Sequence, residues 1–193
     1  EMGKLMVTGG GPGAMEATHL GAWMAGRSDA EVNEAVDMLM PSPTYKDEGW
    51  LRRSFEVMER FPLQSEYHSL AIPTWYYGHE PTAPFATDIA KYFDNSVRED
   101  GIVTIAKGGI IYTPGSAGTM QEIFQDAGQN HYESVGYASP MVFMGKEYYT
   151  HYMPAYTLLK DLSDRGIFKN MILTISDDND EIIDAIVRFK EER

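Results

Sequence analysis

Apolar and polar positions along the chain form short runs that predict strands, separated by longer segments that predict helices. The predicted strands are apolar runs bounded by turn residues, at 4–8, 69–75, 108–113, 141–144 and 171–175. The other segments show helical or amphipathic spacing, at 14–25, 28–39, 45–61, 85–103, 120–127, 152–165 and after 177–179. Such alternation predicts an α/β protein with a doubly wound parallel sheet and helices on both faces.

Two of the predicted strands end in glycine-rich turns that lead directly into a helix. These turns are Gly9–Gly13 and Gly115–Thr119. A helix that starts in this way presents unpaired N–H groups and the positive end of its dipole, and glycine lets an anion approach the backbone closely. Either turn alone equally fits a tight chain reversal, but two in one small sheet favour a ligand. We therefore expect both turns to hold the phosphate of one nucleotide.

The sequence around these turns distinguishes between classes of nucleotide. Residues 9–14 (GGGPGA) fit the dinucleotide pattern G-x-G-x-x-A, which raises the alternative of a nicotinamide dehydrogenase. That site needs a second strand ending in an acidic residue, whereas Asp29, Glu31 and Glu34 lie in a predicted helix. The second turn lacks the lysine with which a P-loop reaches the β and γ phosphates. A monophosphate fits this chain better than a dinucleotide or a triphosphate.

The composition limits the partners and the compartment. The 193 residues include 16 Lys and Arg against 29 Asp and Glu, a formal charge of -13, which disfavours nucleic acid and anionic membranes. There is no cysteine, which fits a reducing compartment, so we expect a cytoplasmic protein. No run resembles a signal peptide or a membrane span, and no His and Asp spacing resembles a metal site. We expect one domain over 1–193, with neither a metal nor another cofactor.

Three segments resemble successive motifs of one known family. They are GGGPGAMEA at 9–17, AIP at 71–73 and, above all, PGSAGTMQE at 114–122. These resemble the motifs of the Lonely-guy (LOG) family of Rossmann-like proteins, whose hallmark is P-G-G-x-G-T-x-x-E. The chain departs from that hallmark only at Ser116. The resemblance excludes roughly 27–68, which we interpret as a helical insertion.

The beginning of the chain also differs from the family pattern. In the family, a strand, a helix and a second strand precede the first glycine turn, and this sequence does not contain them. We therefore expect the parent protein to be longer at its N-terminus.

The resemblance implies a reaction and roles for two residues. It implies hydrolysis of the N-glycosidic bond of a nucleoside 5′-monophosphate, with release of the free base and ribose 5-phosphate. Glu122 matches the hallmark carboxylate, which would stabilise oxocarbenium character at the ribose and orient the attacking water. Arg98 matches the family arginine if one residue is inserted before Pro114, and would pair with the phosphate or with Glu122. The resemblance further implies a homodimer.

The predicted phosphate or nucleotide ligands are residues of the two turns. They are Gly10, Gly11, Gly13 and Met15 at the first turn, and Pro114, Gly115, Ser116, Gly118 and Thr119 at the second.

The same residues also fit structural interpretations that involve no ligand or catalysis. Glu122 also fits a helix-surface carboxylate favoured by the dipole, and Arg98 a solvated helix residue. His131 and Tyr132 fit a subunit contact, a place near the base, or a helix end that packs on the core. The aromatic loop 75–81, with His79 and Glu80, has the composition of a pocket lining. Because Ser116 and Gln121 depart from the family pattern, the alternative function is a nucleotide-binding or sensing module without turnover.

Overall fold

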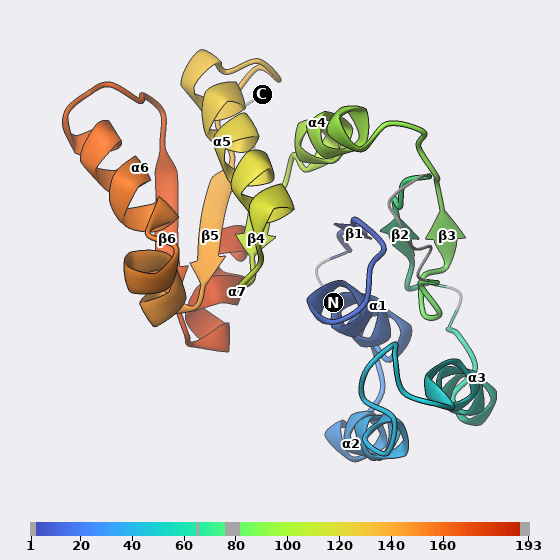
Figure 1. The fold of residues 1–193 in the computed structure, drawn as a ribbon. Helices are drawn as coiled ribbons and strands as arrows, with labels where there is room; N and C mark the ends of the chain where they lie inside the picture. The colour runs from blue at the N-terminus through green and yellow to red at the C-terminus, as the bar shows by residue number, and fades with distance from the viewer. Residues whose placement is uncertain (1–2, 65, 76–81, 190–193) are drawn as a thin grey trace. The chain divides into compact units, whose positions relative to one another are not determined.

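The chain divides into two compact units, each built around a three-stranded parallel sheet. The computed structural model describes residues 3–64, 66–75 and 82–189. The units are Glu1–Arg98, with strand order β1-β2-β3, and Glu99–Arg193, with strand order β4-β5-β6 (Figure 1). Parallel sheets interleaved with helices confirm the predicted α/β class and are consistent with a Rossmann-like fold. The interpretation of 1–193 as one domain stays a prediction.

The first unit alternates short strands with helices. Its strands are β1 (Met6–Thr8), β2 (Ser69–Ala71) and β3 (Asp88–Ile89), and its helices are α1 (Ala14–Trp23), α2 (Asp29–Leu39) and α3 (Trp50–Arg60). Helix α4 (Asn95–Ile105) crosses the boundary between the units. The first glycine turn joins β1 to α1, as the sequence predicts. The parallel pairing of β1 with β2 sets Thr8 opposite Ala71, so the end of β2 lies beside this turn.

The prediction of one helix over 85–103 is wrong. That segment first forms β3 beside β2 and becomes helical only from Asn95. Its backbone continues to bond to the chain after β2, because the Tyr92 N–H donates to the Pro73 carbonyl at 3.0 Å and the Trp75 N–H donates to the Tyr92 carbonyl at 2.8 Å. These bonds satisfy backbone groups at what would otherwise be an open sheet edge.

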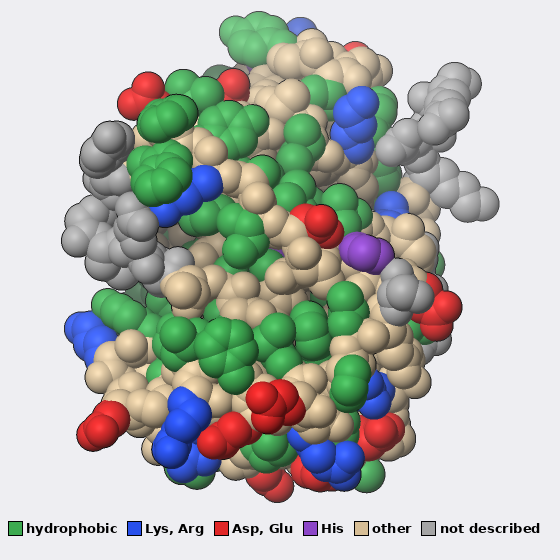
Figure 2. Space-filling view, turned by 90° about the vertical axis from the view of Figure 1, so that its right-hand side faces the viewer, with side chains coloured by type: hydrophobic (Ala, Val, Ile, Leu, Met, Phe, Trp, Pro, Cys, Tyr) green, Lys and Arg blue, Asp and Glu red, His purple; other side chains and the backbone are tan. Residues whose placement is uncertain are grey.

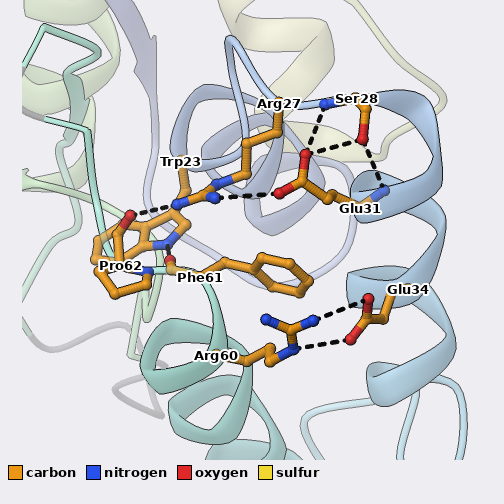
Figure 3. Close-up of polar contacts among 8 residues, drawn as sticks. All are labelled: Trp23, Arg27, Ser28, Glu31, Glu34, Arg60, Phe61 and Pro62. Carbon is orange, nitrogen blue, oxygen red and sulfur yellow. Dashed lines mark hydrogen bonds and ion pairs between the residues drawn. The ribbon is translucent and has the colours of Figure 1, made fainter.

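The segment 27–68 contains α2 and α3, which are held to the end of α1 (Figure 3). Ser28 is the N-cap of α2. It forms a capping box with Glu31, whose carboxylate accepts from the Ser28 N–H at 2.9 Å. The Trp23 indole donates to the Phe61 carbonyl at 2.7 Å, and Arg27 donates to the Pro62 carbonyl at 2.6 Å.

A shared apolar core accompanies these polar contacts. Its buried members are Trp23, Met24, Ala35, Val57, Phe61 and Phe85. Because α1, α2 and α3 all contribute to this core, the predicted insertion is part of the packing that fixes the helix after the first glycine turn.

The second unit has helices on both faces of its sheet. Its elements are β4 (Ile110–Tyr112), α5 (Ala117–Tyr132), β5 (Pro140–Met144), a π-helical turn η1 (Tyr148–Tyr152), α6 (Ala155–Asp164), β6 (Ile172–Ser176) and α7 (Asn179–Val187). Side chains of the central strand β5 alternate between the two faces. Met141 and Phe143 pack in the core with α5 and α6, whereas Val142 packs against Ile182 and Ile186 of α7.

Charged side chains of both signs lie between apolar ones on the face drawn in Figure 2. Exposed apolar side chains in the chain include Phe93, Tyr132 and Tyr152, with 72%, 78% and 75% of their surface accessible. None of the helices in the described part of the chain has the length and apolar character needed to cross a membrane.

Candidate functional site

The second glycine turn joins β4 to α5, and its shape depends on two glycines. A Cβ at Gly115 would overlap the Thr119 hydroxyl and lie 3.0 Å from the Thr119 Cβ. A Cβ at Gly118 would lie 3.1 Å from Oε1 of Glu99. Ser116, the helix N-cap, has φ -116°, outside the left-handed region that favours glycine. Serine therefore fits the position where the family hallmark has its second glycine.

The N-terminus of α5 begins at an exposed N-cap residue, Ser116, whose side chain does not cap the helix. The N–H groups of its first turn, at Ala117, Gly118 and Thr119, have no acceptor within the helix. The N-cap residue Ser116 makes no side-chain capping hydrogen bond, and the first helical bond runs from the Met120 N–H to the Ser116 carbonyl at 3.1 Å. Ser116 and Ala117 are exposed. Open N–H groups and the helix dipole together suit an anion such as phosphate.

Two tyrosines of η1 hold the backbone that leads into this turn. The Tyr148 hydroxyl donates to the Gly115 carbonyl, and the Tyr149 hydroxyl donates to the Thr113 carbonyl at 2.6 Å. Burial raises the pKa of Tyr149, and the charges of Tyr148 and Glu122 raise it further, so this hydroxyl stays protonated. Because both bonds go to carbonyl oxygens, they fix the turn without using its N–H groups.

Glu122 lies one helical turn beyond Gly118, on the side of α5 that contacts α4. Gly118 packs next to Glu99 of α4, and the Gln125 amide donates to Asp100 of α4 at 2.5 Å. Residues three and four apart share one helix face, so Glu122 lies between these two contacts. Its side chain is partly buried. The hallmark carboxylate thus follows the open helix end directly.

Two buried carboxyl groups near Glu122 were not predicted from the sequence. Glu99 exposes 1% of its surface and Asp126 exposes 2%. Asp126 accepts a hydrogen bond from the Tyr112 hydroxyl at 2.6 Å, and burial raises its pKa to about 7, although that hydrogen bond partly offsets the shift. Acidic residues in helices are usually on the surface, so composition gave no sign of this burial. The only sequence signal was position, since Glu99 adjoins Arg98 and Asp126 follows Glu122 by four residues.

The first glycine turn differs from the second, because its N–H groups already have acceptors within the chain. The Gly10 N–H donates to the Thr8 hydroxyl at 3.0 Å, and the Gly11 N–H donates to the Met15 sulfur at 3.4 Å. Both glycines are buried, and Gly10 has φ 73° with its backbone against the side chains of Ala71 and Pro73. Phosphate contact by Gly10 and Gly11 stays a prediction, and it requires these internal bonds to be exchanged.

Arg98 lies against this first turn. A Cβ at Gly9 would lie 2.9 Å from Nη1 of Arg98 and 3.2 Å from the Met15 sulfur. Nη2 of Arg98 donates to the Asn95 side-chain oxygen at 2.9 Å, within the first turn of α4. The structure therefore places the predicted catalytic arginine at the first glycine turn, with Gly9 leaving room for its guanidinium.

A pocket of about 280 Å³ opens beside the start of α1. It is lined by Pro12, Gly13, Glu16, Pro43, Thr44 and Tyr45. The Trp50 indole donates to Oε1 of Glu16 at 2.9 Å. Burial raises the pKa of Glu16, while hydrogen bonds from Trp50 and from the Gly13 N–H oppose that shift. The pocket was not predicted from the sequence, because half of its lining comes from the segment interpreted as an insertion.

The remaining candidates have structural contacts or lie outside the described residues. Nδ1 of His131 accepts from the Lys169 N–H at 3.0 Å, and its ring packs edge-on against Phe168, which matches the packing interpretation. Tyr132 beside it is exposed. Residues 76–81, with His79 and Glu80 of the predicted aromatic loop, lie outside the described residues. Within the described ranges, no three His, Asp or Glu side chains gather in a way that would hold a metal ion.

Comparison with known proteins adds no assignment. A scan against protein-family models finds none that matches this chain, and a search of curated proteins finds no match. The functional assignment therefore depends on the motif residues and on their geometry.

Proposed function

We propose that this protein hydrolyses the N-glycosidic bond of a nucleoside 5′-monophosphate to give the free base and ribose 5-phosphate. The observation that supports the proposal is the second turn. Its helix starts at exposed residues without a side-chain cap from Ser116, its backbone is held by Tyr148 and Tyr149, and a partly buried carboxylate, Glu122, follows one turn later. A phosphate at the N–H groups of 117–119 would accept hydrogen bonds from the start of the helix and interact favourably with its dipole.

The proposed reaction is a displacement at the anomeric carbon of the ribose. The bond between C1′ and the base nitrogen breaks, and its electron pair leaves with the base, which takes up a proton. Positive charge develops on the ribose, and the Glu122 carboxylate stabilises it and orients the attacking water. The water oxygen then bonds to C1′, and Glu122 accepts the proton that this oxygen loses and releases it to solvent, which balances the proton taken up by the base.

Arg98 supplies positive charge in this proposal. Its guanidinium is planar and permanently charged, so it suits paired hydrogen bonds to a phosphate or carboxylate. The close packing on Gly9 and the bond to Asn95 hold the side chain in one orientation. Orienting the guanidinium before binding reduces the entropy lost when a ligand binds.

A binding or sensing module without turnover is the second candidate. Two observations favour it. Gln121, where the family commonly has a glutamate, is exposed and uncharged, and the N–H groups of Gly10 and Gly11 are already bonded within the chain. Such a protein would hold a nucleotide at the second turn without breaking it.

The proposal also includes a compartment and an assembly state. We place the activity in the cytoplasm because the sequence lacks cysteine. We propose a homodimer because the resembling family assembles in that way. Neither a metal nor another cofactor enters the proposed reaction.

A panel of purine and pyrimidine nucleoside monophosphates tests the reaction. Wild-type protein should release free base from at least one of them, and Glu122→Gln should abolish release while binding stays within a few-fold. Gln121→Ala is the matched control, because it changes the exposed neighbour on the same helix turn and should keep activity. Binding by wild type without release from any member of the panel would favour the sensing module.

A further inference from the structure

We propose that the exposed ring of Tyr152 stacks against the base of the nucleotide whose phosphate binds at the second glycine turn. This inference rests on the proposed function, because it assigns the part of the site that holds the base. Every residue that it involves belongs to the unit Glu99–Arg193, so the geometry lies within one compact unit.

The π-helical turn η1 brings Tyr148 and Tyr152 to one side of the chain. The Met153 N–H donates to the Tyr148 carbonyl at 2.8 Å, and this bond across five residues is the bond of a π-helix. One turn of such a helix takes more than four residues, so side chains four apart project in similar directions. The two rings are accordingly adjacent, with centroids 6.5 Å apart and planes inclined by 33°. Turns of this kind are rare and frequently occur at functional sites.

The side of η1 that carries these two rings faces the second glycine turn. The Tyr148 hydroxyl donates to the Gly115 carbonyl, so its ring connects that turn to the ring of Tyr152. Burial raises the pKa of Tyr149, the next residue of η1, and the charges of Tyr148 and Glu122 raise it further. An electrostatic effect of Glu122 on Tyr149 requires the two side chains to be near each other. Thus η1 is close both to the proposed phosphate site and to the carboxylate that acts at the ribose.

Tyr152 offers the apolar surface to which a base can pack. It exposes 75% of its surface, whereas Tyr149 of the same turn is fully buried. Aromatic rings pack in offset or tilted arrangements, and every nucleobase has a flat face that can stack on an aromatic side chain. The neighbouring ring of Tyr148 is fixed by its bond to the backbone and restricts the Tyr152 ring before a ligand binds, which reduces the entropy lost on binding.

Stacking of this kind recognises a base without contacting its polar edge. The contact therefore accepts both purines and pyrimidines. It is stronger for the larger purine ring system, because more apolar area is buried.

The test compares nucleotides with ribose 5-phosphate, which has the same ribose and phosphate but no base. Dissociation constants of the full chain are measured by calorimetry for AMP, UMP and ribose 5-phosphate. The Glu122→Gln background prevents hydrolysis during the titration. Adding Tyr152→Ala should weaken AMP by about tenfold, the effect of one stacked base, and UMP by a smaller factor. The affinity for ribose 5-phosphate should stay within about twofold, because this ligand has no base to stack.

Three variants serve as controls. Tyr152→Phe keeps the ring and removes only the hydroxyl, so it should retain the affinity for AMP. Ile183→Ala removes an exposed apolar side chain from α7, which packs on the face of the sheet opposite to Tyr149, and should change none of the three affinities. Gly115→Ala disrupts the turn itself and should weaken all three ligands. Thermal unfolding establishes that each variant is folded, and light scattering that it keeps the assembly state of the parent protein.

The outcomes separate this inference from the proposed reaction. If Tyr152→Ala changes AMP and ribose 5-phosphate binding equally, or changes neither, the stacking site is overturned even if wild type releases base. A selective loss of AMP affinity in Tyr152→Ala, with no base released by wild type, would support the stacking site and contradict the reaction. Ribose 5-phosphate binding that is unaffected by Gly115→Ala would place the phosphate away from the second turn and overturn both.

Discussion

Gly115 and Thr119 are in contact across the second glycine turn, because any Cβ on Gly115 would overlap the Thr119 hydroxyl. These are the first glycine and the threonine of the hallmark sequence. The contact gives the glycine a steric role that is independent of backbone dihedral angles. It also explains why serine is accepted at position 116 and would not be accepted at 115, since Ser116 has φ -116° and its side chain is exposed.

Gly115→Ala should therefore disrupt the turn. The added methyl group must displace Thr119 or shift the backbone, and such overpacking typically costs about 1–3 kcal/mol. We expect a loss of stability in urea unfolding and at least tenfold weaker nucleotide binding in calorimetry. Gly128→Ala is the control within the same helix, because a Cβ there meets no atom within 4 Å. It should stabilise α5 by about 0.5–1 kcal/mol. An alanine at 115 that is as well tolerated as one at 128 would contradict the packing described.

The buried carboxyl of Asp126 should make stability depend on pH. Burial raises its pKa from 3.8 to about 7, so the folded state holds this proton more tightly than the unfolded chain. The resulting stabilisation is fully present below about pH 4 and is lost as the pH rises through about 7. Asp126→Asn keeps an acceptor for Tyr112 and cannot ionise. In urea unfolding at several pH values, the variant should gain stability relative to wild type by a few kcal/mol between pH 4 and 8. Parallel curves for the two proteins would show that Asp126 does not titrate in this range.

Much of the fold follows from local sequence, because its signals act over a few residues. The glycine turns and the strand predicted at 141–144 need only their own neighbours, and the structure confirms these predictions. The segment 85–103 could not be predicted in the same way. Its first part forms β3 because the edge of β2 offers it backbone partners, and that edge is distant in sequence.

In the candidate site, too, some residues can be located from local sequence, whereas others depend on contacts between segments that are distant in sequence. The hallmark turn and Glu122 could be located from their sequence pattern. Glu99, Asp126 and Tyr148 could not, because their surroundings depend on which elements pack against α5 and the turn. The hydrogen bonds made by the Gly10 and Gly11 N–H groups could not be predicted either. A glycine-rich turn can have the same sequence when its N–H groups bind a ligand and when they bond to the protein itself.

Arg98 should be needed for nucleotide binding. Arg98→Met removes the guanidinium that packs on Gly9, and Arg98→Lys keeps the charge but loses the planar arrangement of donors. We expect KM to rise by about 100-fold in the first variant and about tenfold in the second, which correspond to about 2.7 and 1.4 kcal/mol. Arg52→Met, at an exposed position on α3, should leave KM unchanged. A KM for Arg98→Met within twofold of wild type would exclude a role for this side chain in binding.

The protein should be a homodimer in solution. Light scattering on the purified chain should then give twice the 21.7 kDa of one copy. An exposed aromatic side chain such as Tyr132 of the second unit provides apolar surface for such an interface. A mass of one chain at micromolar concentration, in protein that binds nucleotide, would contradict the dimer.

In the proposed reaction, the N-terminus of α5 holds the nucleotide phosphate and Glu122 acts at the ribose. A crystal structure of Glu122→Gln with a bound nucleoside 5′-monophosphate tests both placements together. We predict phosphate oxygens within hydrogen-bond distance of the N–H groups of 117–119, with the amide at position 122 next to the anomeric carbon. A nucleotide bound elsewhere, with these N–H groups unoccupied, would show that the second turn is not the phosphate site.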